Sequence, residues 1–278
     1  MKHFLARFLR KLGILNRFNL IDTVNFNGRD IKVPIINGIG FGNLNSHEPW
    51  MMDILMELTK ARKGVFMDIG VNIGQTLMKI KSLDESIRYI GFEPNPLCVF
   101  YANDLVRVNK FENVTIIPAG IFNRNDILKL NFNNSDATDS SASLIENFRP
   151  DTPVFDTHYV PVVDISVIFS KLDIDAISII KIDVEGAELE VLESLRPIII
   201  VYKPTLLLEI LPVYSEDNIM RKERQEKIEK LVSEMEYMFH RILRTPDDHY
   251  RGLQQIDSIG IHSDMSQCDY VLTPLEQS

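Results

Sequence analysis

Val65-Phe66-Met67-Asp68-Ile69-Gly70-Val71-Asn72-Ile73-Gly74 is the stretch that decides the fold of this chain. An apolar run ends in an acid, and two glycines four residues apart then lead into a helical pattern at residues 75–80. This order is typical of a buried parallel strand followed by a tight turn and a helix. Glycine suits the turn because it has no Cβ to obstruct a ligand and readily adopts positive φ. Amides at the helix start can bind ligand oxygens, so the stretch predicts a small-molecule site.

Composition and charge narrow the class of protein. The 278 residues suffice for one large α/β domain with an N-terminal extension, and 45% hydrophobic with 25% charged residues is ordinary for a soluble protein. The net charge of −9 argues against a nucleic-acid partner, because phosphates need a basic surface. Cys98 and Cys268 lack metal-ligand spacing, so we expect buried, reduced thiols and a cytoplasmic protein.

The first 18 residues have a different character from the rest of the chain. Their spacing predicts an amphipathic helix, and the charges interrupt the apolar core that a secretory signal needs. Three interpretations stay open: a helix packed on its own domain, a peripheral membrane contact through residues 1–18, and an organelle transit peptide. The segment contains no acid; its basic residues are Lys2, Arg7, Arg10, Lys11 and Arg17, and its apolar ones are Phe4, Leu5, Phe8, Leu9, Leu12, Leu15 and Phe18.

The remaining chain predicts an α/β fold in two parts. Residues 1–63 contain the first helix, a hairpin joined by Asn27-Gly28 (21–26 and 29–36) and a leading helix that starts at Pro49. Residues 64–278 alternate between strands and helices, which indicates a mostly parallel sheet covered on both faces. We expect strands at 65–69, 88–93, 114–118, 177–183, 205–210, 239–243 and 270–272, and helices at 74–82, 96–109, 187–195 and 217–237.

Two segments depart from this alternation. The last two strands are separated only by a loop containing Gly252 and Gly260, so we expect a hairpin or a mixed edge at that end of the sheet. Residues 131–159 form a long polar loop between strand-like pieces. Loops of that length in compact domains are usually functional or disordered.

The residues after the second strand indicate which ligand the site takes. Glu93 lies about 20 residues beyond the glycines, where an acid accepts hydrogen bonds from ribose hydroxyls. The glycine pattern is D-x-G-x-x-x-G, which lacks the third glycine of a dinucleotide fingerprint. An acid such as Asp68 beside the loop disfavours a pyrophosphate but suits the ammonium and sulfonium of S-adenosylmethionine.

Three stretches together resemble the FkbM family of S-adenosylmethionine-dependent methyltransferases: Phe66-Met67-Asp68-Ile69-Gly70-Val71-Asn72-Ile73-Gly74, Gly91-Phe92-Glu93-Pro94-Asn95-Pro96 and Ile180-Lys181-Ile182-Asp183-Val184-Glu185-Gly186-Ala187-Glu188. The resemblance covers roughly residues 64–210, and the last stretch is its most specific part. It implies the class I methyltransferase fold, a Rossmann-like, seven-stranded, mostly parallel sheet with an antiparallel C-terminal strand. It also implies S-adenosylmethionine as the cofactor.

The resemblance assigns the cofactor residues to the ends of the first three strands. Asp68, Gly70, Asn72 and Gly74 would line the methionine end, and Glu93 would hold the ribose. Ser140, Ser141 and Ser143 match a serine-rich stretch that would close over the cofactor, although an ordinary polar loop explains them equally well. Asn95 would orient its loop, and Ala119, Gly120 and Ile121 would frame the adenine.

Asp183 and Glu185 follow the fourth strand, nearest the methyl group, and are the first catalytic candidates. A carboxylate there can accept the proton of an acceptor hydroxyl, and that of Asp183 can also steer the sulfonium. Glu185 is the second choice, because it can instead cap the following helix. Glu209, at the end of the fifth strand, is the third candidate. No third metal ligand is evident beside these acids, so we predict no metal.

The predicted activity is an O-methyltransferase that acts on a hydroxyl, and the resemblance points to a sugar in a glycan, polysaccharide or secondary metabolite. The acceptor is then a small molecule or a glycan. N-methylation or methylation of a small metabolite is the alternative within the enzyme class. A catalytically inactive binding protein is the alternative outside it, although Asp68, Gly70, Gly74, Glu93 and Asp183 are all retained.

Overall fold

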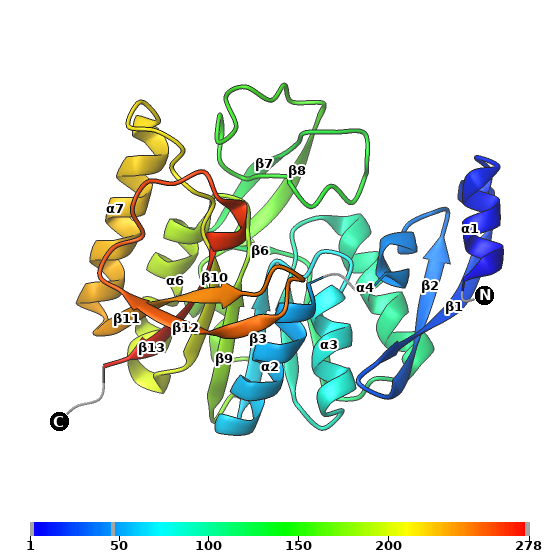
Figure 1. Cartoon of the computed structure of the whole chain (residues 1–278), viewed down its shortest axis with the longest axis horizontal. Helices are drawn as coiled ribbons and strands as arrows, with labels where there is room; N and C mark the ends of the chain where they lie inside the picture. Colours follow the sequence, from blue (N-terminus) through cyan, green and yellow to red (C-terminus); the bar gives the residue numbers. More distant parts are fainter. Residues whose placement is uncertain (1–2, 46–47, 276–278) are drawn as a thin grey trace.

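The computed structural model of the chain describes residues 3–45 and 48–275. It begins with helix α1 (Phe4–Lys11), a short 3-10 turn η1 (Leu15–Arg17) and the hairpin of β1 (Asn19–Phe26) and β2 (Arg29–Ile36) (Figure 1). Asn27 and Gly28 have φ of 49° and 81°. Two successive positive φ angles are what a type I′ turn requires, so the predicted hairpin and its turn are confirmed.

The leading helix α2 (Pro49–Ala61) follows a second 3-10 turn, η2 (Phe41–Leu44). Pro49 occupies the first turn of α2, where a missing N–H costs no hydrogen bond. Ser46 and His47, which the sequence places just before this helix, lie outside the described residues. Trp50, Ile54 and Leu55 are buried, so α2 belongs to the core of the molecule.

An eight-stranded sheet forms the centre of the molecule in the order β12-β11-β13-β10-β9-β3-β4-β5. The strands from β10 to β5 are parallel, and β13 pairs antiparallel with both β10 and β11. The strand bounds are β3 Val65–Ile69, β4 Tyr89–Phe92, β5 Val114–Ile117, β9 Ile177–Ile182, β10 Thr205–Glu209, β11 Tyr237–Arg244, β12 Tyr250–Ile256 and β13 Asp269–Pro274.

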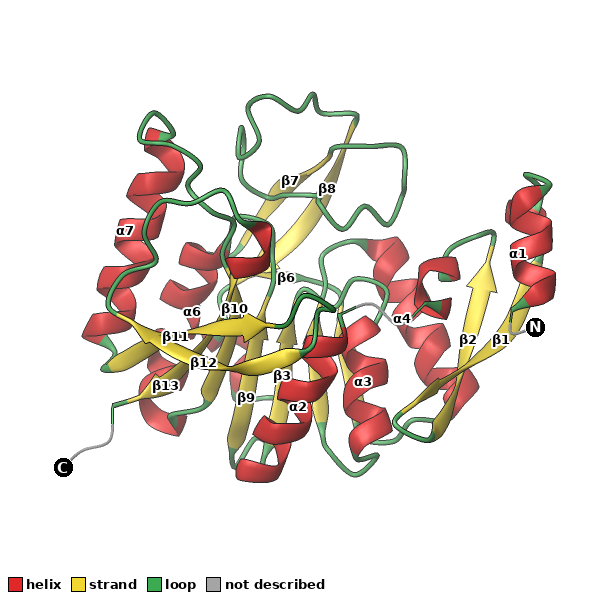
Figure 2. Ribbon diagram, in the orientation of Figure 1, coloured by secondary structure: helices red, strands yellow, loops and turns green. Residues whose placement is uncertain are grey.

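Helices cover both faces of this sheet, as the long apolar strands predict (Figure 2). On one face α2, α3 (Gln75–Leu83) and α4 (Pro96–Asn109) pack against Phe66 and Ile179. On the other face α6 (Glu188–Tyr202) and α7 (Ile219–Glu234) pack against Met67 and Ile180. Adjacent residues of one strand thus point into different cores, which gives the three-layer α/β fold that the sequence predicts.

The large sheet has one strand more than predicted, and one helix is longer than predicted. The sheet has eight strands instead of seven, because β12 pairs with β11 where a loop was expected. The strand β12 contains Gly252 and has no fully buried residue, and its sequence lacks the apolar alternation that marks a strand. Helix α6 continues past Pro197 to Tyr202. A proline inside a helix costs about 3 kcal/mol, but burying Ile198 and Ile199 returns about 1.5–3 kcal/mol each.

A second, smaller sheet and a long loop lie above the strand ends. The sheet has the order β6-β8-β7, with bounds Gly120–Ile121, Asp156–Val163 and Asp126–Phe132. Residues 133–155 connect β7 to β8 and rise over the carboxyl ends of the large sheet (Figure 2). A short helix, α5 (Ser166–Phe169), follows β8, and η3 (Met265–Gln267) precedes β13. The predicted polar loop therefore lies next to the edge where a ligand is expected.

The N-terminal part packs on the sheet domain through α4. The Asn109 side chain exchanges hydrogen bonds with the Lys32 backbone, and the Tyr101 hydroxyl donates to the Pro34 carbonyl at 2.8 Å. The division at residue 63 stays a prediction. Among the described residues, no helix is both long enough and apolar enough to cross a bilayer.

Candidate functional site

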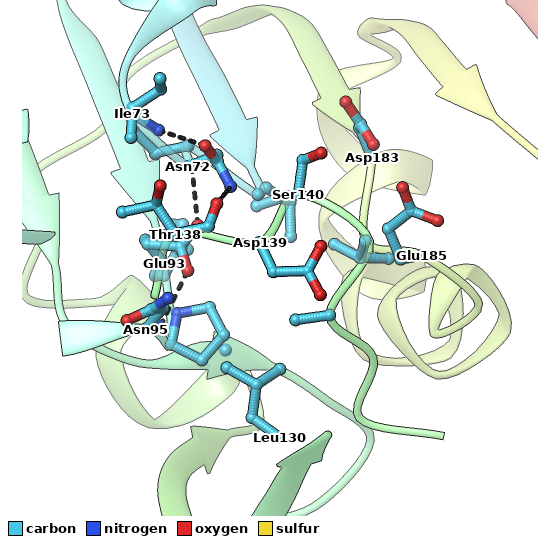
Figure 3. A pocket seen from close by; sticks show the side chains of 18 of the residues that line it. Asn72, Ile73, Glu93, Asn95, Leu130, Thr138, Asp139, Ser140, Asp183 and Glu185 are labelled. Carbon is cyan, nitrogen blue, oxygen red and sulfur yellow. Dashed lines mark hydrogen bonds between the residues drawn. The ribbon is translucent and has the colours of Figure 1, made fainter. Parts of the chain in front are cut away.

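A cavity of about 450 Å³ opens at the carboxyl ends of β3, β4, β9 and β10 (Figure 3). Its volume is typical of small-molecule sites, and it lies where the strand order reverses, between β3 and β9. Five predicted site residues do not line it: Asp68, Gly74, Ala119, Ser141 and Ser143. The predicted residues that do line it are Gly70, Asn72, Glu93, Asn95, Gly120, Ile121, Ser140, Asp183, Glu185 and Glu209.

Gly70 and Gly74, in the loop after β3, are required for different structural reasons. Gly70 has φ of +95°, and a Cβ at this position would collide with the backbone oxygen of Asp183. The loops after β3 and β9 therefore touch, and only glycine lets them approach this closely. Gly74 has φ of +75°, and a Cβ there would come within 2.8 Å of the Leu105 side chain. Gly74 thus admits the packing of α4 and does not reach the cavity.

Glu93 is held by backbone amides from two loops. Its carboxylate accepts hydrogen bonds from the amides of Asn72 at 2.7 Å and Asn95 at 2.8 Å (Figure 3). Burial raises the pKa of Glu93 to about 7, although these two hydrogen bonds favour the ionised form. The carboxylate faces the cavity, and its oxygens can accept further hydrogen bonds beyond these two. It can therefore bind two hydroxyl groups of a ligand.

The long loop is tied to the same two asparagines. The side-chain amide of Asn72 donates to the Thr138 carbonyl at 3.2 Å (Figure 3). The side-chain amide of Asn95 donates to the Ala137 carbonyl at 2.8 Å. Asn95 also caps α4 by accepting from the Leu97 amide. The segment 136–140 is thereby fixed over the cavity wall that Glu93 occupies.

The serines of this loop divide between two roles. Ser140 lines the cavity, whereas Ser141 donates its hydroxyl to Asp139 at 2.7 Å and stays behind the wall. Ser143 is buried and donates to the Glu185 carbonyl at 2.7 Å. The structure corrects the place expected for Ser141, since the loop presents the neighbouring Asp139 and Ser140 to the cavity.

The structure also corrects the place expected for Asp68. Its side chain is fully buried behind the wall, where it accepts from the Tyr89 hydroxyl and lies 3.5 Å from the Lys181 ammonium. Burial raises the pKa of Asp68 against the effect of Lys181. Because a two-residue period puts alternate strand residues on one face, Lys181 and Asp183 could have been paired from the sequence.

Lys181 joins Asp68 to the predicted catalytic acid. Its ammonium lies 2.9 Å from the Asp183 carboxylate, and both groups are at the cavity wall. Burial opposes ionisation of Asp183, but the Lys181 ammonium outweighs it and holds the pKa of Asp183 below its ordinary value. The charge of Asp183, together with burial, raises the pKa of the neighbouring Glu209 to about 11. At neutral pH Asp183 is therefore the ionised member of the pair and Glu209 the protonated one.

Glu185 is not a helix cap. It has φ of 54° and pairs with Arg149 from the long loop. Helix α6 begins at Glu188, whose own carboxylate accepts from the Gly186 amide at 2.8 Å. Burial and the charge of Asp183 raise the pKa of Glu185 to about 7. Glu185 faces the cavity opposite Glu93, next to Asp183 (Figure 3).

The charge of the wall fits a cationic ligand. Among the described lining residues Lys181 is the one base, and its ammonium is already paired with Asp183. Glu48 reaches the cavity from just before α2 and pairs with Lys79 at 2.9 Å; no local signal predicted its position. The described part of the chain has no group of three or more potential ligands arranged for a metal ion. The acids of the wall are Glu48, Glu93, Asp136, Asp139, Asp183, Glu185 and Glu209.

Comparison with known proteins identifies the family. A family model described as "Methyltransferase FkbM domain" matches residues 68–245, which is more than half of the chain. A comparison with curated proteins finds no match.

Several solved structures align with this chain at low sequence identity. An FkbM methyltransferase from Methylobacillus flagellatus KT has 16% identity and a TM-score of 0.46; the alignment covers 76% of this chain and 43% of that one. A precorrin-6y C5,15-methyltransferase from Geobacter metallireducens GS-15 has 12% identity, a TM-score of 0.40 and coverage of 81% and 87%. An S-adenosylmethionine-dependent methyltransferase from Aquifex aeolicus has 11% identity, a TM-score of 0.41 and coverage of 81% and 90%.

The family assignment rests on the family model, and the strand order and the acid-lined cavity agree with it. The chain belongs to the FkbM family of S-adenosylmethionine-dependent methyltransferases.

Proposed function

We propose that the enzyme transfers the methyl group to a hydroxyl of a sugar, in a glycan, polysaccharide or secondary metabolite. The observation that carries the proposal is the position of the Asp183 carboxylate at the cavity wall, 2.9 Å from the Lys181 ammonium, which favours its ionised form. A neutral hydroxyl must lose its proton during methylation, so it needs such a base. The acid-rich wall also offers many acceptors for the hydroxyls of a sugar.

In the proposed mechanism the residues of the wall orient the acceptor and manage one proton. S-Adenosylmethionine, held in this cavity, would supply the methyl group and leave as the neutral thioether. Asp183 accepts the hydroxyl proton and directs the oxygen toward the methyl carbon. Glu209, which keeps its own proton, donates a hydrogen bond to Asp183 or the acceptor. Lys181 stays charged, because Asp183 and Asp68 raise its pKa against the effect of burial.

The cofactor residues are part of the same proposal. The Glu93 carboxylate accepts hydrogen bonds from the two ribose hydroxyls. The backbone at Gly120 and Ile121 lies beside the adenine. Gly70 and Asn72 border the methionine end. The support comes from their shared place on the cavity wall and from the fixed Glu93 carboxylate.

Replacing Glu93 tests the ribose assignment. We expect Glu93→Ala to weaken S-adenosylmethionine binding by about 10²-fold, because two charge-assisted hydrogen bonds contribute about 1.5 kcal/mol or more each. Calorimetric titration measures the affinity. Glu223→Ala on α7, an exposed acid that does not line the cavity, is the matched control and should bind normally. Unchanged affinity in Glu93→Ala would remove Glu93 from this role.

Cofactor affinity should depend on pH through the same residue. The pKa of Glu93 in the ligand-free protein is about 7, mainly through burial, with Asp68 raising it and Lys181 lowering it. The ionised form accepts both hydroxyls, so affinity should rise about tenfold between about pH 6 and about pH 8. Calorimetry at several pH values measures this, and Glu93→Gln should flatten the dependence. A wild-type affinity that falls over this range would contradict the assignment.

The site of methylation tests the function directly. We expect a panel of saccharides and amines, incubated with enzyme and S-adenosylmethionine, to give an O-methyl ether on a saccharide, located by mass spectrometry and NMR. A product methylated only on nitrogen would refute the proposal.

Cys98 and Cys268 are both free and buried, which agrees with a reducing compartment. We therefore propose that the enzyme works in the cytoplasm.

A further inference from the structure

Helix α1 lies at one end of the molecule, beyond the β1–β2 hairpin (Figure 1). Few residues of α1 face the protein: Ala6 and Leu9 are buried, and Leu15 of η1 is buried in the same core. His3 lies 3.0 Å from Asp22 of β1, which fixes the start of the helix. The expectation that this segment packs on its own domain is thus confirmed for one side of α1.

The outer side of α1 presents larger apolar residues to solvent. They recur at spacings of one, four and eight residues, which places them on one face of a helix. Phe4 and Phe8 also stack on each other, with ring centroids 6.0 Å apart. An apolar stripe of this kind usually marks an interaction surface. Its members and exposed fractions are Phe4 67%, Leu5 55%, Phe8 47% and Leu12 54%.

The charge around this stripe is opposite to that of the remaining protein. Arg7, Arg10, Lys11 and Arg17 are all exposed, and residues 1–18 carry five positive charges and no negative one. Since the chain as a whole has a net charge of −9, the remainder carries −14. An anionic surface would attract α1 and repel the other faces, so the charge asymmetry fixes the orientation of binding.

We propose that α1 docks this enzyme on the surface of an anionic lipid bilayer. Phe4, Leu5, Phe8 and Leu12 enter the boundary between headgroups and acyl chains, and the basic residues pair with lipid phosphates. This contact would bring the enzyme to a membrane-borne acceptor, and only that purpose rests on the proposed function. The contact itself depends on α1 alone.

The position of α1 relative to the cofactor cavity agrees with such a purpose. A hollow beside α1 is lined by Arg10, Leu15, Asn16 and Phe41, and by Asp136, which also lines the cofactor cavity. The Arg10 guanidinium lies over the Phe41 ring at 4.4 Å, so the end of the helix is fixed to this hollow. The hollow beside α1 and the cofactor cavity therefore have Asp136 in common.

Vesicle flotation of the full-length protein tests the contact. We expect the wild type to float with vesicles of phosphatidylcholine and phosphatidylglycerol, much less with phosphatidylcholine alone, and to be released by salt. Phe4→Ser/Phe8→Ser should lower the partition coefficient at least about tenfold, because both rings lose their apolar contact. Lys11→Gln/Arg17→Gln should lower it by about as much.

Ile200→Ser/Val201→Ser on α6 is the matched control, since these residues are also exposed but lie far from α1 (Figure 1). It should float like the wild type, and all variants should keep their affinity for S-adenosylmethionine. The proposal is overturned if the wild type does not float, if it binds neutral vesicles equally well, or if the serine variant of α1 still floats. A serine variant that changes the oligomeric state instead would make the stripe a subunit interface. Failure of methyl transfer would leave these readouts unaffected.

Discussion

Gly70→Ala should abolish measurable S-adenosylmethionine binding and destabilise the fold by roughly 3 kcal/mol or more, because strain and a steric clash act together. The added Cβ meets the backbone oxygen of Asp183, and φ at this position is +95°. Neither loop can retreat easily, because the Asp183 amide donates to the Ile69 carbonyl at 3.0 Å. The clash therefore displaces both the glycine loop and Asp183, the proposed catalytic acid.

Urea denaturation and calorimetric titration measure the two effects separately. Gly260→Ala is the matched control: its φ is +76°, but no atom lies within 4 Å of an added Cβ. It should lose only about 1 kcal/mol from backbone strain and bind the cofactor normally. If Gly70→Ala binds as tightly as the wild type, the close contact of the two loops does not shape the site.

The second large effect is expected for Asp183→Asn. Turnover should fall about 10²- to 10⁴-fold, because the amide cannot accept the hydroxyl proton. Cofactor affinity should change by only a few fold, since Lys181 retains Asp68 as a partner and Glu93 is untouched. Initial rates with a saccharide acceptor and calorimetry give the two quantities.

Glu185→Gln is the competing variant for this test. Glu185 lines the same wall and is paired with Arg149, so its loss should affect the loop more than the chemistry. If Glu185→Gln stops turnover while Asp183→Asn retains it, then Glu185 is the base and the proposed mechanism is wrong.

The parts of the fold that could be predicted depend on local signals. Each of these signals can be recognised within a few residues. They are the run Val65–Ile69 with Gly70 and Gly74, the turn Asn27-Gly28 and the acid Glu93. The strand positions around the cavity follow from apolar runs of the length that a covered parallel sheet requires. These signals correctly placed most of the predicted lining residues at one edge of the sheet.

The parts that could not be predicted depend on long-range packing. Asp68 was expected at the wall because it adjoins the glycines, but pairing with Tyr89 and Lys181 holds it behind the wall. Glu48 and Arg149 reach the site from distant segments whose own sequence gives no sign of it. The edge strand β12 was not predicted, because it contains a glycine, has no fully buried residue and lacks apolar alternation.

A crystal structure of the full-length enzyme with S-adenosylhomocysteine would test the central claim most directly. We predict that the ribose hydroxyls contact Glu93, that the adenine lies beside Gly120 and Ile121, and that the sulfur faces Asp183. A ligand bound away from the cavity between β3 and β9, or one whose ribose does not approach Glu93, would contradict the account.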